Sequence, residues 1–137
     1  MAVDAAIARV REVGELETVI AAQAQKPNGS LVVMPDTFTT ANRAKITALA
    51  LQYQLPATYP FHYFSKAGGL LSYGNDTNDS YARAAVYADR ILKGDTPSEL
   101  PVQAPVKFQL IVNLKTAKAL GLNMPDRVLA RADEVIE

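Results

Sequence analysis

The sequence predicts an α/β fold in which a mostly parallel sheet carries helices on both faces. Short apolar runs, such as SLVVMPD at 30–36, alternate with segments whose apolar residues recur every three or four positions. This alternation is typical of strands and helices in a parallel sheet. The length of 137 residues fits a single domain of that class.

The expected elements of the first half are a strand at 2–10, a helix at 14–26, a strand at 30–36, a helix at 39–54 and a strand at 55–61. The first helix ends where proline and Asn-Gly follow Lys26, because neither continues a helix. The run at 30–36 is continuously apolar, which is typical of a strand buried on both faces. Thr39 or Thr40 can cap the second helix.

The expected elements of the second half are a strand at 70–73, a helix at 79–93, an irregular linker at 95–105, a strand at 106–113, a helix at 114–121 and a last helix that Asn123 can cap. The helix at 79–93 has the clearest periodicity, and Gly94 supplies its C-terminal stop. Its apolar stripe consists of Tyr81, Ala84, Ala85, Ala88, Ile91 and Leu92.

Composition limits the classes of function. The 14 basic residues balance 14 acidic ones, so no phosphate-binding surface is indicated and nucleic acid is not expected as a partner. The chain has no cysteine, which excludes disulfides, thiolate catalysis and cysteine-bound metals. No apolar run approaches the roughly 20 residues of a membrane span. No secretory signal opens the chain, so the protein as given is expected in the cytoplasm.

Three loops are expected at one edge of the sheet. They cover residues 35–40, 59–64 and 72–77, and each follows a predicted strand. Ligands of open α/β sheets bind beyond the carboxyl ends of the strands. Aromatic residues are concentrated in two of these loops, beside Asp36 and Asn75, and concave ligand sites are mostly apolar with a few placed polar groups. The sequence therefore favours a small-molecule pocket at this edge.

The polar run NDTND at 75–79 raises the question of a metal site. A calcium loop requires a central glycine and a glutamate at its twelfth position, and this spacing is not met. A helix start explains the run better, with Asp76 or Asn78 as the cap and Asp79 near the positive end of the helix dipole. The glycines at 68, 69 and 74 match neither the dinucleotide-binding nor the P-loop pattern. No metal and no cofactor are expected.

His62 and Asp36 are the residues on which an enzyme could depend. His62 is the only histidine, and no nucleophile-elbow motif accompanies it. Asp36 could act as a nucleophile or base, contact a ligand, or cap the turn at 37–40. Catalysis requires the two side chains to come within hydrogen-bonding reach, and capping or ligand contact is the favoured role for Asp36.

Several motifs give the chain a family resemblance. The runs GGLLSYG, ILKG followed by PVQAP, NLKTAKALGL and LARADEVI, together with GSLVVMPDTFTTANRAKITALA, resemble the C-terminal half of solute-binding proteins of ABC transporters. The similar branch is related to the tryptophan- and tyrosine-binding group. The resemblance implies a Rossmann-like three-layer sandwich, here one incomplete lobe of a periplasmic binding protein-like fold. Residues 2–66 and 106–137 would form the second lobe, and 73–94 would include a helix that packs on the first lobe.

The resemblance also implies a function and its partners. The chain is expected to be a truncated, non-enzymatic binding component of an ABC importer, periplasmic in the family, that binds an amino-acid-like molecule and works with a permease. The expected ligand-binding residues are Asp36, Thr37, Tyr59, Phe61, Tyr73, Asn75 and Asp76. Because the stripe of helix 79–93 lacks its usual partner, a homodimer or swapped assembly is expected. A stand-alone dimeric interaction module without a small ligand is the alternative.

Overall fold

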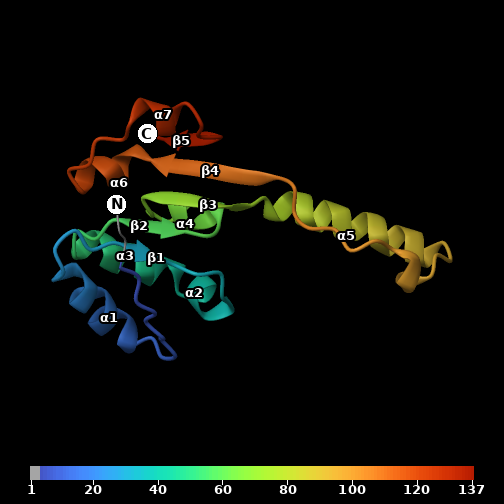
Figure 1. The fold of residues 1–137 in the computed structure, drawn as a ribbon, viewed down its shortest axis with the longest axis horizontal. Helices are drawn as coiled ribbons and strands as arrows, with labels where there is room; N and C mark the ends of the chain where they lie inside the picture. The colour runs from blue at the N-terminus through green and yellow to red at the C-terminus, as the bar shows by residue number, and fades with distance from the viewer. Residues whose placement is uncertain (1–3) are drawn as a thin grey trace.

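The computed structural model describes residues 4–137 as a five-stranded sheet with helices around it (Figure 1). The strands follow one another across the sheet in the order β1-β2-β3-β4-β5, and only the β3–β4 pair is antiparallel. The mixed α/β fold with a mostly parallel sheet is therefore confirmed. Its strands are β1 (Leu31–Val32), β2 (Ala57–Tyr59), β3 (Leu71–Asn75), β4 (Phe108–Asn113) and β5 (Glu134–Ile136).

The helices join these strands in the expected alternation. They are α1 (Glu15–Ala24), α2 (Thr37–Ala41), α3 (Arg43–Gln52), α4 (His62–Lys66), α5 (Thr77–Leu92), α6 (Leu114–Ala119) and α7 (Asp126–Leu129), with a 3₁₀ turn η1 (Pro97–Glu99) in the linker after α5. Among residues 4–137, no helix is long and apolar enough to cross a membrane.

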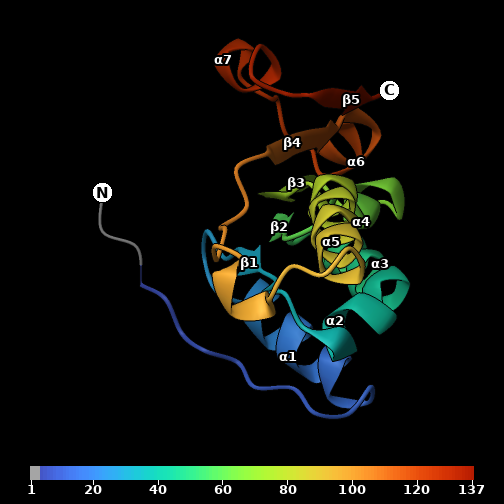
Figure 2. The same ribbon diagram turned by 90° about the vertical axis from the view of Figure 1, so that its right-hand side faces the viewer.

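The core lies between one face of the sheet and helices α1, α3 and α4 (Figure 2). Phe64 of α4 is fully buried, and its ring stacks on that of Tyr59 at 5.2 Å. The apolar stripes of α1 and α3 close the same cluster with Leu16, Ile20, Ile46, Leu49 and Ala50. Burial of these side chains is the main favourable contribution to folding, at about 1.5–3 kcal/mol for each large one.

The opposite face of the sheet is more open. Val32, Tyr73 and Phe108 are exposed there, and α7 covers only the end near β4, where Val128 and Leu110 line a shallow hollow. The prediction that the strand at 30–36 is buried on both faces was therefore wrong: Val33 is buried, whereas Val32 and Met34 are exposed. The reason is that β1 lies at the sheet's edge and meets the core on one side only.

Other differences concern short elements. Residues 4–10 contain no strand, because no neighbouring strand pairs with them, and residues 2 and 3 of that prediction lie outside the described part. The helix predicted at 39–54 is two helices that meet at Asn42, whose side chain donates to the Phe38 carbonyl at 2.9 Å. It begins after Asp36, so neither Thr39 nor Thr40 is its cap. The last helix begins after Pro125 rather than after Asn123.

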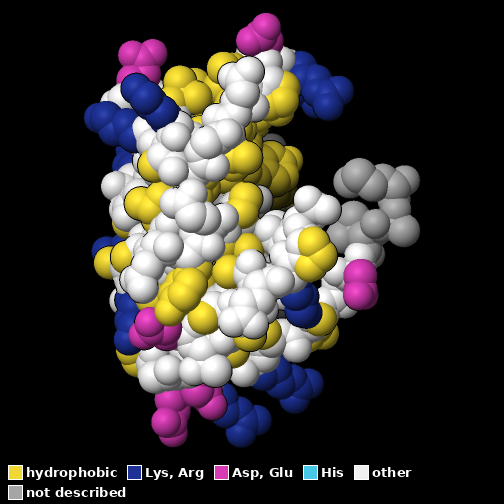
Figure 3. Space-filling model, turned by 90° about the vertical axis from the view of Figure 1, so that its left-hand side faces the viewer, with side chains coloured by type: hydrophobic (Ala, Val, Ile, Leu, Met, Phe, Trp, Pro, Cys, Tyr) yellow, Lys and Arg dark blue, Asp and Glu magenta, His cyan; other side chains and the backbone are white. Residues whose placement is uncertain are grey.

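Helix α5 projects away from the sheet as an arm (Figure 1). Residues of the returning linker contact it: Arg83 Nη1 donates to Gln103 Oε1 at 3.3 Å, and the Tyr87 hydroxyl donates to the Pro101 carbonyl. No residue of α5 is buried. The end of the molecule opposite this arm carries both signs of charge among scattered hydrophobic side chains (Figure 3).

Candidate functional site

The three parallel strands bring predicted site residues to one edge of the sheet. Because β1, β2 and β3 run in the same direction, their carboxyl ends share an edge. Asp36 follows β1, Phe61 follows β2 and Asn75 ends β3. This arrangement of the three loops agrees with the prediction made from parallel strands.

Asp36 is an exposed carboxylate at the start of α2. Its Oδ1 accepts a hydrogen bond from the Phe38 amide at 2.7 Å, so the side chain caps the helix. Its second oxygen makes no hydrogen bond or ion pair with any residue among 4–137. Thr37, the first residue of α2, is exposed beside it. Asp36 is therefore free to bind a cation or a hydrogen-bond donor while it caps the helix.

The predicted aromatic residues divide into a core group and a surface group. Tyr59 is only 2% exposed and stacks on Phe64, and burial raises the pKa of its hydroxyl. Phe61 is half-buried and lies 5.3 Å from Tyr63 between ring centres. Tyr73 is 57% exposed and stacks at 5.8 Å on Phe108 of the neighbouring strand. Tyr73 is thus exposed and Phe61 is partly exposed while packing against the core, whereas the ring of Tyr59 belongs to the core.

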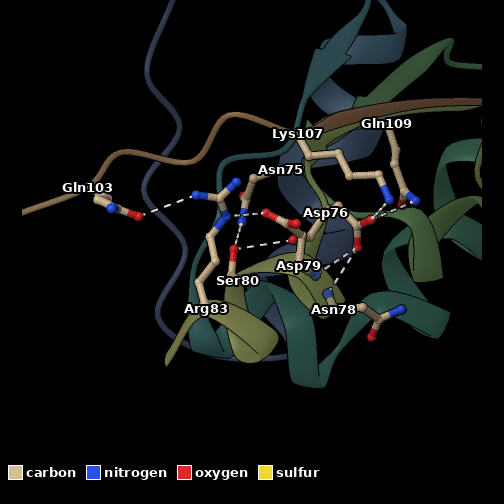
Figure 4. Close-up of polar contacts among 9 residues, drawn as sticks. All are labelled: Asn75, Asp76, Asn78, Asp79, Ser80, Arg83, Gln103, Lys107 and Gln109. Atoms are coloured by element: carbon tan, nitrogen blue, oxygen red, sulfur yellow. Dashed lines mark hydrogen bonds and ion pairs between the residues drawn. The ribbon is translucent and has the colours of Figure 1, made fainter. Parts of the chain in front are cut away.

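Asp76 is the most extensively bonded carboxylate of this edge (Figure 4). It is 4% exposed. Its Oδ1 caps α5 by accepting from the amides of Asn78 at 3.0 Å and Asp79 at 3.4 Å. Its Oδ2 accepts from Gln109 Nε2 at 3.2 Å and lies 2.8 Å from Lys107 Nζ. The backbone amide of Asp76 also donates to the Lys107 carbonyl at 2.9 Å.

These contacts join the two segments that connect the α5 arm to the sheet, one between β3 and α5 and the other between the linker and β4. We call the three residues Asp76, Lys107 and Gln109 the crossover clamp. The hydrogen bond from Lys107 lowers the pKa of the Asp76 carboxyl, and the amides of Asp79 and Asn78 add to that effect while desolvation opposes it. In return, the hydrogen bond to Asp76 raises the pKa of the Lys107 ammonium. Asp76 is thus an ionised, internally satisfied structural group.

Asn75 also uses one of its side-chain groups for a hydrogen bond within the chain. Its side-chain amide donates to the Ser80 hydroxyl at 3.2 Å, and that hydroxyl donates to the Asp76 carbonyl at 3.2 Å. The side-chain oxygen of Asn75 makes no hydrogen bond within residues 4–137 and lies at the strand's end. The structure therefore leaves Asn75 one acceptor that could face a ligand.

His62 and Asp36 do not form a catalytic pair in the described residues. His62 is half-buried and lies at the start of α4 rather than in a loop. Its Nδ1 is buried and has no hydrogen-bond partner among residues 4–137. Its ring meets that of Tyr63 edge to face at 5.4 Å. Asp36 bonds to the Phe38 amide instead. Within the same residues, no group of three metal-binding side chains comes together.

Sequence reasoning did not connect Lys107, Phe108 and Gln109 to this edge. The strand at 106–113 was expected, but its partner was not. Antiparallel pairing of β3 with β4 places Asn75 opposite Phe108 and Gly74 opposite Gln109. The basic residue just before a strand was the only signal, and it does not by itself identify a partner 31 residues away in the chain.

Comparison with solved structures shows the same fold in larger proteins. A conserved domain protein from Vibrio cholerae O1 biovar El Tor has a TM-score of 0.80 and 24% identity, with 89% of this chain and 41% of that one covered. An ABC domain in complex with L-Trp from Streptococcus pneumonia has a TM-score of 0.79 and 23% identity, with 90% and 42% covered. The chain thus spans about two fifths of the length of these structures.

A third solved structure has the same fold, and the comparison with protein families also finds a match. The ligand-free, open form of a substrate binding protein with adhesive properties from Clostridium difficile has a TM-score of 0.65 and 21% identity, with 93% of this chain and 42% of that one covered. No curated protein matches the chain. The family described as ABC transporter substrate binding protein matches over residues 1–136. The chain therefore belongs to the ABC transporter substrate binding protein family.

Proposed function

We propose that this chain contributes one wall of the ligand site of an ABC importer's solute-binding protein, and that the ligand is an amino acid with an aromatic or branched side chain. The observation that carries the proposal is that Asp36, Phe61 and Asn75 lie at the carboxyl ends of three adjacent parallel strands. Family membership supports solute binding. Action in the periplasm and with a permease stays a prediction.

The chemistry of this edge suits an amino acid. The uncommitted oxygen of Asp36 can accept a hydrogen bond from an α-ammonium group. The exposed ring of Tyr73 and the half-buried ring of Phe61 offer faces for an aromatic or branched side chain. Asp76 is committed to the crossover clamp, so Asp36 is the better candidate for the ligand's positive charge. The L-Trp complex of a similar fold is consistent with this choice.

Ligand-dependent thermal stability tests the proposal. L-tryptophan, L-tyrosine and L-leucine are titrated against the chain while its melting temperature is followed, because a ligand of the folded state raises that temperature. Asp36→Asn preserves a good N-cap residue but removes the negative charge. We expect at least about tenfold weaker binding of the amino acid that binds wild type, since hydrogen bonds to charged groups are the stronger ones.

Two controls separate the proposed contact from indirect effects. Asp126→Asn removes a comparable exposed acid at the start of α7 and is expected to leave binding unchanged. Indole-3-propionate, which lacks the ammonium group, is expected to be insensitive to Asp36→Asn. A loss of affinity for this analogue equal to that for L-tryptophan would contradict the charge contact. A stable, folded chain that binds no amino acid would contradict the proposed ligand class.

A further inference from the structure

Arg43, the first residue of α3, holds its guanidinium between two of the loops at the ligand edge. Its Nη1 donates to the Thr40 carbonyl at 3.2 Å, and Thr40 belongs to α2, which follows β1. Its Cζ lies over the ring of Tyr63, 5.7 Å from the ring centre, and Tyr63 belongs to α4, which follows β2. The side chain therefore bridges the two loops that carry Asp36 and Phe61.

The aromatic residues beneath this guanidinium hold it in place. The Tyr63 ring is partly buried against the hydrophobic core, and the ring centres of Phe61 and Phe64 lie 5.3 Å and 5.5 Å from its own. A planar cation is attracted to the face of such a ring. Arg43 itself is exposed, so the contact leaves the cation accessible. Its position is thus set before a ligand arrives, which lowers the entropic cost of binding.

Most of the hydrogen-bond donors of Arg43 are available to a ligand. A guanidinium has five N–H donors in a planar fork, and Arg43 uses one of them within residues 4–137. No carboxylate of the same residues forms an ion pair with it. A free fork of this kind matches a carboxylate, which accepts two parallel hydrogen bonds from it.

The stability of α3 does not account for an arginine at this position. The first turn of α3 contains no acidic residue, and Lys45 adds a second positive charge to it. Cations are unfavourable in the first turn of a helix, because the helix dipole is positive at that end. The charge of Arg43 is therefore unfavourable for α3 itself, which points to a role outside the helix.

Asp36 and Arg43 present opposite charges at the same edge and do not neutralise each other. No ion pair joins them in the described part of the chain. Thr40, which accepts from Arg43, lies one turn of α2 after Asp36, a rise of about 5.4 Å, and its amide donates to the Asp36 carbonyl at 3.0 Å. Lys107, another cation at this edge, is committed to Asp76. The arrangement suits a small ligand that carries both an ammonium and a carboxylate group.

We infer that Arg43 binds the carboxylate of the ligand and that the site thereby selects zwitterionic amino acids over the corresponding amines. This inference rests on the proposed function, to which it adds the group that recognises the negative charge of the ligand. Asp36 and Arg43 then divide the recognition of one zwitterion between the start of α2 and the start of α3.

Three indole compounds separate the two charges experimentally. L-tryptophan carries both charged groups, tryptamine lacks the carboxylate and indole-3-propionate lacks the ammonium. The chain has no tryptophan, so the fluorescence of the ligand's indole reports the binding of each compound directly. Arg43→Met removes the guanidinium and keeps an unbranched side chain that can lie on Tyr63. We expect at least about tenfold weaker binding of L-tryptophan and indole-3-propionate, since hydrogen bonds between charged groups are lost, and unchanged binding of tryptamine.

Two further variants control for charge and for side-chain shape. Lys45→Met removes the same charge from the same turn of α3, at an exposed position without an ion pair among residues 4–137, and is expected to leave all three affinities unchanged. Arg43→Lys keeps the charge but not the planar fork, so its affinity for L-tryptophan should lie between those of wild type and Arg43→Met. Circular dichroism checks that each variant is folded.

The outcomes distinguish this inference from the proposed function. Undiminished binding of L-tryptophan by Arg43→Met, an equal loss for all three compounds, or equal effects of Arg43→Met and Lys45→Met would overturn the carboxylate contact while amino-acid binding stands. Arg43-dependent binding of indole-3-propionate by a chain that binds no amino acid would support the contact and overturn the proposed ligand class. A folded chain that binds none of the three compounds would overturn both.

Discussion

At the scale of single residues, Gly74 allows β3 to pass close to the end of β2. A Cβ at this position would lie 1.8 Å from the carbonyl oxygen of Pro60, which is far below any contact distance. The glycine therefore serves close backbone approach rather than an unusual backbone angle. Its neighbours Tyr73 and Asn75 lie at the carboxyl end of β3, which can take this path because residue 74 has no side chain.

Gly74→Ala is accordingly expected to destabilise the chain by about 1–3 kcal/mol, the usual effect of overpacking, because the added methyl group pushes β3 away from Pro60. The control is Gly14→Ala, where an added Cβ meets nothing within 4 Å and the backbone is in the helical region. That change should be neutral or stabilise by up to about 1 kcal/mol. Urea unfolding followed by circular dichroism measures both, and equal free energies of unfolding would contradict the close-approach argument.

Single residues also show which roles can be predicted from the sequence and which cannot. The capping role of Asp76 follows from its place before a periodic helix, and the structure confirms it. Its contacts with Lys107 and Gln109 depend on the pairing of β3 with β4, which no local pattern reveals. The same holds for Tyr59, which belongs to an expected edge loop by position but has its ring in the core. Ligand contact by any of the predicted residues stays a prediction.

At the scale of elements, length explains part of what the sequence revealed, although the short strands β1 and β2 were also predicted, from their apolar runs and the prolines around them. The 16 residues of α5 repeat their apolar pattern often enough to be recognised. Helix α4 has 5 residues and β5 has 3, which is too short for any period to be seen. Strand β5 was not predicted, although it pairs with β4 and extends the sheet.

The crossover clamp is the element-scale feature with a defined pH dependence. The folded pKa of Asp76 is lowered, so its contribution to stability is present above its unfolded pKa of about 3.9 and is lost as the pH falls through the folded value. The folded pKa of Lys107 is raised, so its contribution is present below about 10.4 and is lost as the pH rises through the folded value. The stability contributions of Asp76 and Lys107 are therefore both fully present between about pH 3.9 and pH 10.4.

A double-mutant cycle with Asp76→Asn and Lys107→Met isolates this pair. The coupling free energy from urea unfolding is expected to be constant from about pH 5 to 9 and to decrease in acid as the pH falls through the lowered pKa of Asp76, where its carboxylate becomes protonated. Its size should be modest, because Lys107 is 60% exposed and solvent screens the pair. A coupling free energy near zero at every pH would show that Asp76 acts only as a helix cap and that its ion pair with Lys107 adds no stability.

At the scale of the whole molecule, the fold class could be predicted from the sequence, whereas the amount of surface that stays exposed could not. The alternation of apolar runs and amphipathic segments predicted the sheet, and the family motifs predicted the fold of the solved relatives. The sequence does not reveal how much surface stays exposed, because that depends on which faces find a neighbour. The open sheet face at Tyr73 and Phe108 is visible only in three dimensions, whereas the stripe of the helix at 79–93 was already expected to lack its usual partner.

Charge balance and exposed apolar surface together predict the solubility of the molecule. With 14 basic and 14 acidic residues and an isoelectric point of about 6.6, little repulsion between molecules opposes association of exposed apolar faces near neutral pH. We expect the solubility in polyethylene glycol to have its minimum near pH 6.6. Lys118→Glu, at an exposed position of α6 without an ion pair among residues 4–137, lowers the net charge by about two. It should move the minimum to lower pH without changing the fold, whereas Lys118→Arg should leave it in place. A minimum that does not move with the added charge would show that apolar contacts alone control the association.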